Sequence, residues 1–162
     1  MISLFGSSLI SLALFLTLTS LGLNLWFIKS KNYRFYHSGR NAIISACLLT
    51  LSAGITLVYA LYISDLSLVY VNKYSSIFTP TIYKIGGFWA GMEGSLLFWV
   101  FILSIYTLVV LYQNRNQYQT LMPWVTIVIA IVMSFFLFMC TAFENPFAPV
   151  DGPIEMGAGL NP

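Results

Sequence analysis

Four long apolar runs dominate the sequence, and each is long enough to cross a lipid bilayer as a helix. A membrane-spanning helix needs about 20 consecutive apolar residues. The runs reach that length without an Asp, Glu, Lys or Arg well inside any of them, and they cover residues 4–28, 42–63, 94–112 and 124–143. In hydrocarbon, backbone amides must be satisfied internally, which favours helices. The sequence therefore predicts an all-α, polytopic integral membrane protein with four transmembrane helices in one membrane domain, 1–162.

The composition excludes several other classes of protein. Hydrophobic residues make up 59% of the chain and charged residues 7%, whereas soluble domains carry about 25% charged residues. The formal net charge of +2 is too small for a nucleic-acid-binding surface, so we expect no nucleic-acid partner. The sequence has no CxxC pair, no His/Cys cluster and no glycine-rich phosphate loop. It therefore predicts no metal site and no catalytic residue.

The basic residues between the runs predict the orientation of the chain. Four lie between the first and second runs, namely Lys29, Lys31, Arg34 and Arg40. The next two connections contain two and one, and the tail contains none. Cytoplasmic loops carry the excess of Lys and Arg, so we expect an N-out, C-out arrangement with an external loop, 64–93, and an external tail, 144–162. Four prolines in the tail predict an irregular, solvated segment.

Local signals predict where some helices begin and end. Residues 66–71 fit either an extended segment or a short helix, and Pro80 should end any helix that begins before it. Pro123 suits the first turn of the fourth helix. The third helix is expected to begin at Gly94, or as early as Tyr83.

Residues 86–100, GGFWAGMEGSLLFWV, concentrate four glycines, two tryptophans and one carboxylate where the external loop meets the third run. On a continuous helix, at about 100° per residue, one side would carry Gly87, Gly91, Gly94 and Phe98. The opposite side would carry Trp89, Glu93, Leu96 and Val100. Small residues at this spacing allow a neighbouring helix to approach closely. The plainer alternative is ordinary helix packing, with the carboxylate stabilising the helix N-terminus through the helix dipole.

Several side chains are candidates for contact with a ligand. Phe88, Trp89 and Trp99 could stack on a flat ligand, although aromatic residues are common at membrane interfaces without one. Met92 could ligate a haem iron, but methionines more often fill packing gaps. His37, the only histidine, lies among basic residues and is expected to be solvated there.

Residues 86–100 resemble the cytochrome c-type biogenesis family, specifically the large haem-lyase component of the cytochrome c maturation system. The family pattern is a tryptophan, two small residues, a variable position, then Glu-Gly-Ser-Leu-Leu and a tryptophan. It corresponds here to Trp89, Ala90, Gly91, Met92, Glu93, Gly94, Ser95, Leu96, Leu97 and Trp99. Further matches to the family's external segments follow in order over residues 64–162, at 65–71, Ser75, 83–84, 144–147 and 157–162.

The resemblance implies a protein that takes haem from a haem chaperone on the external face and attaches it to apocytochrome c. The residues implied as contacts to the haem edge are Trp89, Glu93 and Phe88. The residues implied as packing positions of the motif are Gly87, Gly91, Gly94 and Ser95. The family's tryptophan-rich motif and haem-ligating histidines are not among these 162 residues, and Met92 stands where the family commonly has His or Gln. We therefore expect the chain alone to hold no stable haem.

Two functions remain open from the sequence. The first is the N-terminal membrane part of a cytochrome c haem lyase, as a fragment or a split subunit. It would work with the remainder of the lyase, in a bacterial or an organellar inner membrane. Whether this piece is itself an enzyme stays open. The second is a small structural or transport subunit of a respiratory complex, which the lack of charged residues at membrane depth disfavours.

Overall fold

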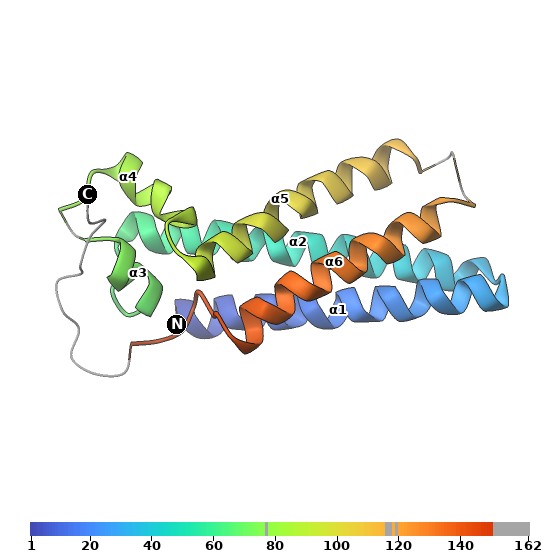
Figure 1. Ribbon diagram of the computed structural model, residues 1–162, viewed down its shortest axis with the longest axis horizontal. Coiled ribbons are helices and arrows are strands. Elements are labelled where there is room, and N and C mark those ends of the chain that lie inside the picture. Colours follow the sequence, from blue (N-terminus) through green and yellow to red (C-terminus); the bar gives the residue numbers. More distant parts are fainter. Residues whose placement is uncertain (77, 116–117, 119, 151–162) are drawn as a thin grey trace.

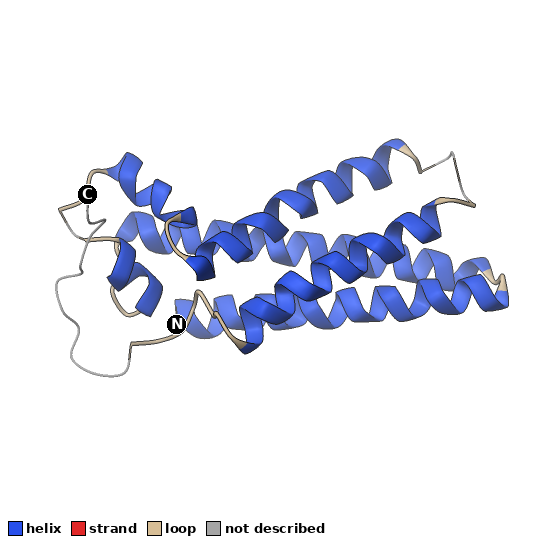
Figure 2. Cartoon of the chain, viewed as in Figure 1, coloured by secondary structure: helices blue, strands red, loops and turns tan. Residues whose placement is uncertain are grey.

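In the described part of the chain, the fold consists of four long helices with three short helices at one end (Figures 1 and 2). A computed structural model describes residues 1–76, 78–115, 118 and 120–150. The long helices are α1 (Ile2–Ser30), α2 (Tyr33–Ile63), α5 (Met92–Gln113) and α6 (Met122–Ala142). The short helices are α3 (Val69–Tyr74), α4 (Thr81–Gly86) and the 3-10 helix η1 (Gly87–Trp89). The described chain is all-α, as predicted, and by length and composition all four long helices are candidates to cross a membrane.

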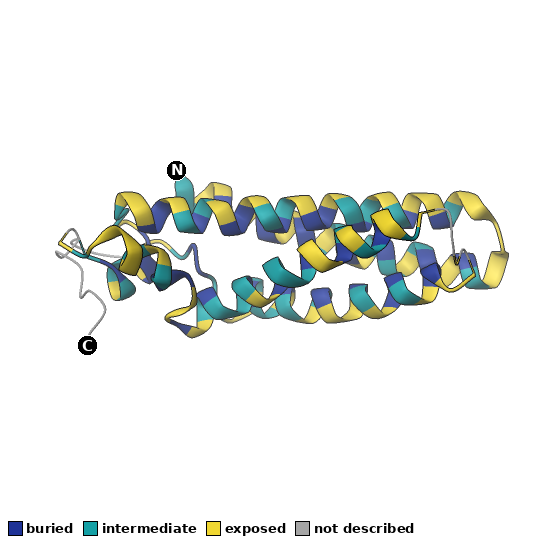
Figure 3. Ribbon diagram, turned by 90° about the horizontal axis from the view of Figure 1, so that it is seen from above, coloured by how far each residue is buried: buried dark blue, intermediate teal, exposed yellow. Residues whose placement is uncertain are grey.

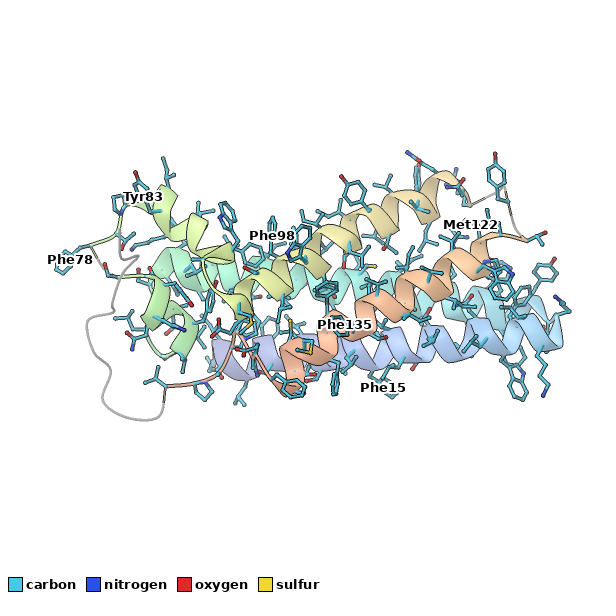
Figure 4. The ribbon with its side chains drawn as sticks, viewed as in Figure 1. Phe15, Phe78, Tyr83, Phe98, Met122 and Phe135 are labelled. Carbon is cyan, nitrogen blue, oxygen red and sulfur yellow. The ribbon has the colours of Figure 1, made fainter. Side chains whose placement is uncertain are left out.

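The four long helices run antiparallel to their neighbours in a bundle (Figure 1). α1 packs on α2 and α6, and α5 packs on the other sides of the same two helices. Buried residues follow the facing sides of the helices and exposed residues follow the outer sides (Figure 3). Large apolar side chains such as Phe15 and Phe135 point outward from the bundle (Figure 4). An outer surface of this kind suits contact with lipid.

The connection between the first two helices is much shorter than predicted. Only Lys31 and Asn32 separate α1 from α2, so most of the predicted loop, 29–41, is helical. Lys31 turns the chain with a positive φ of 55°, and the Asn32 side-chain oxygen accepts the Arg34 amide at 3.1 Å, which caps α2. The apolar run marks only the part of a helix that crosses hydrocarbon. The polar residues 33–41 continue the helix beyond it.

Other predicted helix boundaries agree with the structure within a few residues. Pro123 lies in the first turn of α6, and Pro80 immediately precedes α4, as expected. The third long helix begins at Met92, two residues before Gly94. Tyr83 belongs to the separate helix α4, so the alternative of a third helix that begins there is wrong.

A buried polar contact joins α1 to α2. The Ser20 hydroxyl donates to the Gly39 carbonyl at 2.7 Å, and the Asn24 amide donates to the Ser20 carbonyl at 2.8 Å. Both side chains are fully buried. A Cβ at Gly39 would collide with the Asn24 amide, so glycine allows the two helices to approach closely here.

The first residues of the tail, 144–150, are packed against the bundle. Phe147 is fully buried over Gly6 of α1, and its carbonyl accepts a hydrogen bond from the Ser3 hydroxyl at 2.7 Å. The prediction of a solvated tail is wrong for these residues, because an aromatic ring fills the space that Gly6 leaves. The remaining tail, 151–162, including the last match to the family, lies outside the described residues.

The same segment also joins the loop between α2 and α5. Leu68 and Pro149 form an isolated antiparallel bridge, and the Val69 amide donates to the Ala148 carbonyl at 2.9 Å. α3 begins at the next residue after this bridge. Of the two alternatives predicted for 66–71, the short helix occurs from Val69 onward, and the extended alternative is limited to the single bridge residue Leu68. Together with Phe147, the bridge connects the start of α1, the loop between α2 and α5 and the segment after α6.

Candidate functional site

The glycine- and tryptophan-rich stretch, 86–100, is not one continuous helix. α4, η1 and α5 follow one another, with a break at Gly91, whose backbone is extended (φ −123°, ψ 170°). The Gly91 carbonyl accepts the Ser95 amide at 2.9 Å and so begins α5. The two-sided arrangement predicted for a continuous helix is wrong at this point. Val100 is fully buried, whereas Trp89, predicted on the same side, is 57% exposed.

Tyr70 of α3 hydrogen-bonds to both sides of this break. Its buried hydroxyl donates to the Gly87 carbonyl at 2.7 Å and accepts from the Gly91 amide at 3.2 Å. Burial raises the pKa of the Tyr70 phenol, so the hydroxyl keeps its proton and remains a donor. The Tyr70 hydroxyl thus gives a partner to the Gly91 amide at the break, and it adds a second hydrogen bond to the Gly87 carbonyl, which also accepts the Ala90 amide at 3.3 Å.

The glycines of the motif make room for the tyrosines of α3. A Cβ at Gly91 would collide with the Tyr74 ring, and one at Gly94 would collide with the Tyr70 hydroxyl and a backbone oxygen. A Cβ at Gly87 would come within 3.3 Å of the Leu61 side chain, in the last turn of α2. Two of the three glycines therefore face a short loop helix, and the third faces α2.

The two aromatic residues before the break lie in different environments. Phe88 is 5% exposed, and its ring packs edge-on against Phe98 and Phe101 at centroid distances of 5.4 and 5.9 Å. Trp89 packs beside Phe98 at 5.8 Å but remains more than half exposed. Of these two rings, only that of Trp89 offers an open face, and Phe88 supports the turn from inside.

Glu93 and Ser95 follow the break in the first turn of α5. A negative charge is favourable at this place in a helix, and one carboxylate oxygen of Glu93 is buried without a hydrogen-bond partner among the described residues. The Tyr74 hydroxyl and, after it, the Glu93 charge raise the pKa of the exposed Lys73. The Ser95 hydroxyl donates to the Trp89 carbonyl at 3.1 Å. This bond links the end of η1 to the first turn of α5.

An apolar groove of about 550 Å³ opens beside the exposed indole. It is lined by Ile82, Tyr83, Ile85, Gly86, Trp89 and Ala90. The groove and the open ring could contact the edge of a flat apolar ligand such as haem. The described residues at this end of the chain offer no imidazole to ligate a haem iron. His37 lies near the other end of α2, roughly 39 Å along the helix from Ile63 at 1.5 Å per residue.

Sequence reasoning missed the residues that build this turn. Tyr70 lies in a segment that resembles the family, but nothing in its spacing indicated a hydrogen bond to a turn 17 residues later. Tyr74 gave no signal either, because its partner in the turn, Gly91, is 17 residues later in the sequence.

Comparison with known proteins gives consistent matches to one group. The chain is 33% identical over 115 residues to the probable cytochrome c-type biogenesis protein NrfE of Escherichia coli (strain K12), covering 71% of this chain and 21% of NrfE. It is 31% identical over 162 residues to the biogenesis protein CcmF of the same strain, covering 97% of this chain and 24% of CcmF. It is 35% identical over 122 residues to the biogenesis protein CycK of Rhizobium meliloti (strain 1021), covering 75% of this chain and 18% of CycK.

A solved structure, "Cytochrome c Heme Lyase CcmF", matches the fold with a TM-score of 0.85 and 29% identity. The match covers 94% of this chain and 26% of that one. No family model matches the chain. The chain therefore spans about a quarter or less of the length of these relatives, but it matches them over most of its own length.

Proposed function

Because the chain belongs to the cytochrome c-type biogenesis family of CcmF, NrfE and CycK proteins, we propose that it forms the membrane part of a CcmF-like cytochrome c haem lyase. In this role it acts in cytochrome c maturation, as the names of its relatives indicate for them. The observation that carries the proposal is the turn from Trp89 to Ser95. It contains the family-like motif, is held by Tyr70, and presents one open indole face.

The proposed partners follow from the same family. The chain works with the remainder of the lyase or with a second subunit, and with a haem chaperone and apocytochrome c. Iron ligands come from those parts, since this chain's only histidine lies at the opposite end of the bundle from the turn. The chain contributes Trp89 and Glu93 at the haem edge, with Phe88 behind them. The complete system resides in a bacterial inner membrane or an organellar inner membrane.

The expected result for the haem role is a loss of covalent haem on cytochrome c. Within the complete system, Trp89→Ala and Glu93→Ala should each lower haem staining of cytochrome c severalfold. Aromatic stacking contributes about 0.5–1.5 kcal/mol, and about 1.4 kcal/mol corresponds to a tenfold change. The matched control is Trp124→Ala, because Trp124 is 53% exposed in the first turn of α6, at the opposite end of the bundle from the turn. Normal haem staining in both test variants would mean that the turn contributes to packing and not to haem handling.

We also propose that the end with α3 and α4 faces outward and that the α1–α2 turn faces the cytoplasm. Four basic residues near that turn support this orientation. Ser67 and Lys31 lie at opposite ends of the bundle, and both are exposed. In intact cells, an impermeant maleimide should label Ser67→Cys but not Lys31→Cys. Cys47 and Cys140 are buried, so background labelling should be low. If the reagent labels Lys31→Cys from outside and does not label Ser67→Cys, the proposed orientation is wrong and the opposite one holds.

A further inference from the structure

An exposed apolar surface covers α4 and the turn after it. Its large side chains are Phe78, Ile82, Tyr83, Ile85 and Trp89, with exposed fractions of 84%, 82%, 62%, 43% and 57%. Phe78 and Tyr83 project away from the bundle at this end (Figure 4). The groove beside Trp89 lies within the same surface. So many exposed apolar side chains on a segment outside the long helices require a non-aqueous partner.

The surface lies at the depth where the long helices end. Gly87 of η1 is placed against Leu61, two residues before the end of α2 at Ile63. α4 packs beside α2, and α5 begins three residues after η1. α4 therefore runs along the bundle at the edge of the spans and not above them (Figure 1).

The surface continues the outer face of α5. Met92, Trp99 and Tyr106 recur every seven residues, which places them on one side of the helix. They are 62%, 61% and 66% exposed, as expected for side chains that face lipid. Trp89 joins this face through its contact with Phe98 at 5.8 Å.

The charge of the segment also suits a phospholipid. Lys84 is the only charged residue between positions 78 and 92, so no carboxylate on this segment repels phosphate groups. A lysine can place its aliphatic chain along apolar surface while its ammonium group reaches the headgroups. Tyr and Trp are enriched at the same level of the membrane.

We propose that α4 and η1 lie in the membrane interface, where the groove between Ile82 and Trp89 holds phospholipid acyl chains and Lys84 meets a phosphate group. The apolar side of such a segment is buried about 5–10 Å into the boundary between headgroups and acyl chains. A flat ligand that reaches Trp89 then approaches from the lipid side and displaces a lipid chain. The lipid contact does not rest on the proposed haem role, because it needs only the described surface.

The test compares two labelled positions at this end of the molecule. Ile82→Cys and Lys73→Cys replace exposed side chains, one on the surface and one in α3. Each variant of the full chain is labelled with bimane and placed in vesicles of phosphatidylcholine and phosphatidylglycerol. Bimane at 82 should lose most of its emission when the lipids carry bromine on their acyl chains, and it should resist quenching by aqueous iodide. Bimane at 73 should show the opposite behaviour.

Two other results would overturn the proposal. Quenching by iodide at position 82, without quenching by brominated lipid, would place α4 in water. Protection of position 82 from both quenchers would mean that protein covers the surface, for example a second copy of the chain.

Because positions 73 and 82 are both exposed, neither substitution should disturb folding. Helical circular dichroism equal to that of the unaltered chain checks this before labelling.

Discussion

Replacing Phe147 by alanine should destabilise the folded chain by about 3–5 kcal/mol, the usual cost of removing a buried phenylalanine ring. The ring is fully buried over Gly6, which has no side chain to close the gap. The same residue carries the carbonyl that accepts the Ser3 hydroxyl. Loss of the ring should therefore loosen the contact between the start of α1 and the segment after α6. Chemical unfolding in detergent, followed by circular dichroism, measures the change.

Phe143→Ala is the matched control for this effect. Phe143 lies four residues earlier and is 67% exposed, so its removal should change the stability by about 0.5 kcal/mol or less. Equal losses for the two variants would contradict the packing role of Phe147. Adding a methyl group at Gly6 should restore part of the loss in the Phe147→Ala background, because it refills the space that the ring leaves. In a chain that keeps Phe147, the same Gly6→Ala change should lower the stability.

The four spans were predictable because the bilayer imposes a simple requirement on sequence. Each crossing needs about 20 apolar residues, and the chain shows four such runs. Helix ends are governed by other forces. The extension of α2 through residues 33–41 depends on the Asn32 cap and on Lys31 in a left-handed conformation. Neither feature changes the apolar pattern from which the spans were predicted.

The packed part of the tail was not predictable from local signals. Prolines and turn residues correctly exclude a helix over 144–150, but they also suggest solvation. The position of Phe147 depends on Gly6, which is 141 residues earlier in the chain and shows no periodic relation to it. The space above a glycine appears only when the helices are assembled.

The candidate site was located through family resemblance, and its geometry came from the structure. Periodicity assumed a continuous helix through Gly91, and that assumption placed Val100 beside Trp89. The extended backbone at Gly91 breaks the helix, and the Tyr70 hydroxyl satisfies the amide at the break. A tertiary hydrogen bond of this kind overrides the helical period but leaves no trace in residue spacing.

Replacing Gly91 by leucine should destabilise the turn by about 2–4 kcal/mol, through overpacking and loss of the hydrogen bond to Tyr70. The backbone at Gly91 is extended, a conformation that leucine adopts without strain, so the cost is steric. The new side chain would collide with the Tyr74 ring. Since Trp89 and Glu93 flank this position, haem staining of cytochrome c in the complete system should fall with the stability. Unfolding in detergent and haem staining measure the two effects.

The same substitution at Gly86 separates a steric cause from a general effect of leucine. A Cβ at Gly86 meets nothing within 4 Å, so Gly86→Leu should leave stability nearly unchanged. A compensating pair tests the contact itself. Gly91→Ala should be harmful alone, yet far less so in a chain that also carries Tyr74→Ala, because the colliding ring is then absent. Contacting residues commonly show coupling of about 0.5–3 kcal/mol in such a cycle. Strict additivity would mean that Gly91 is required for some reason other than the close approach of α3.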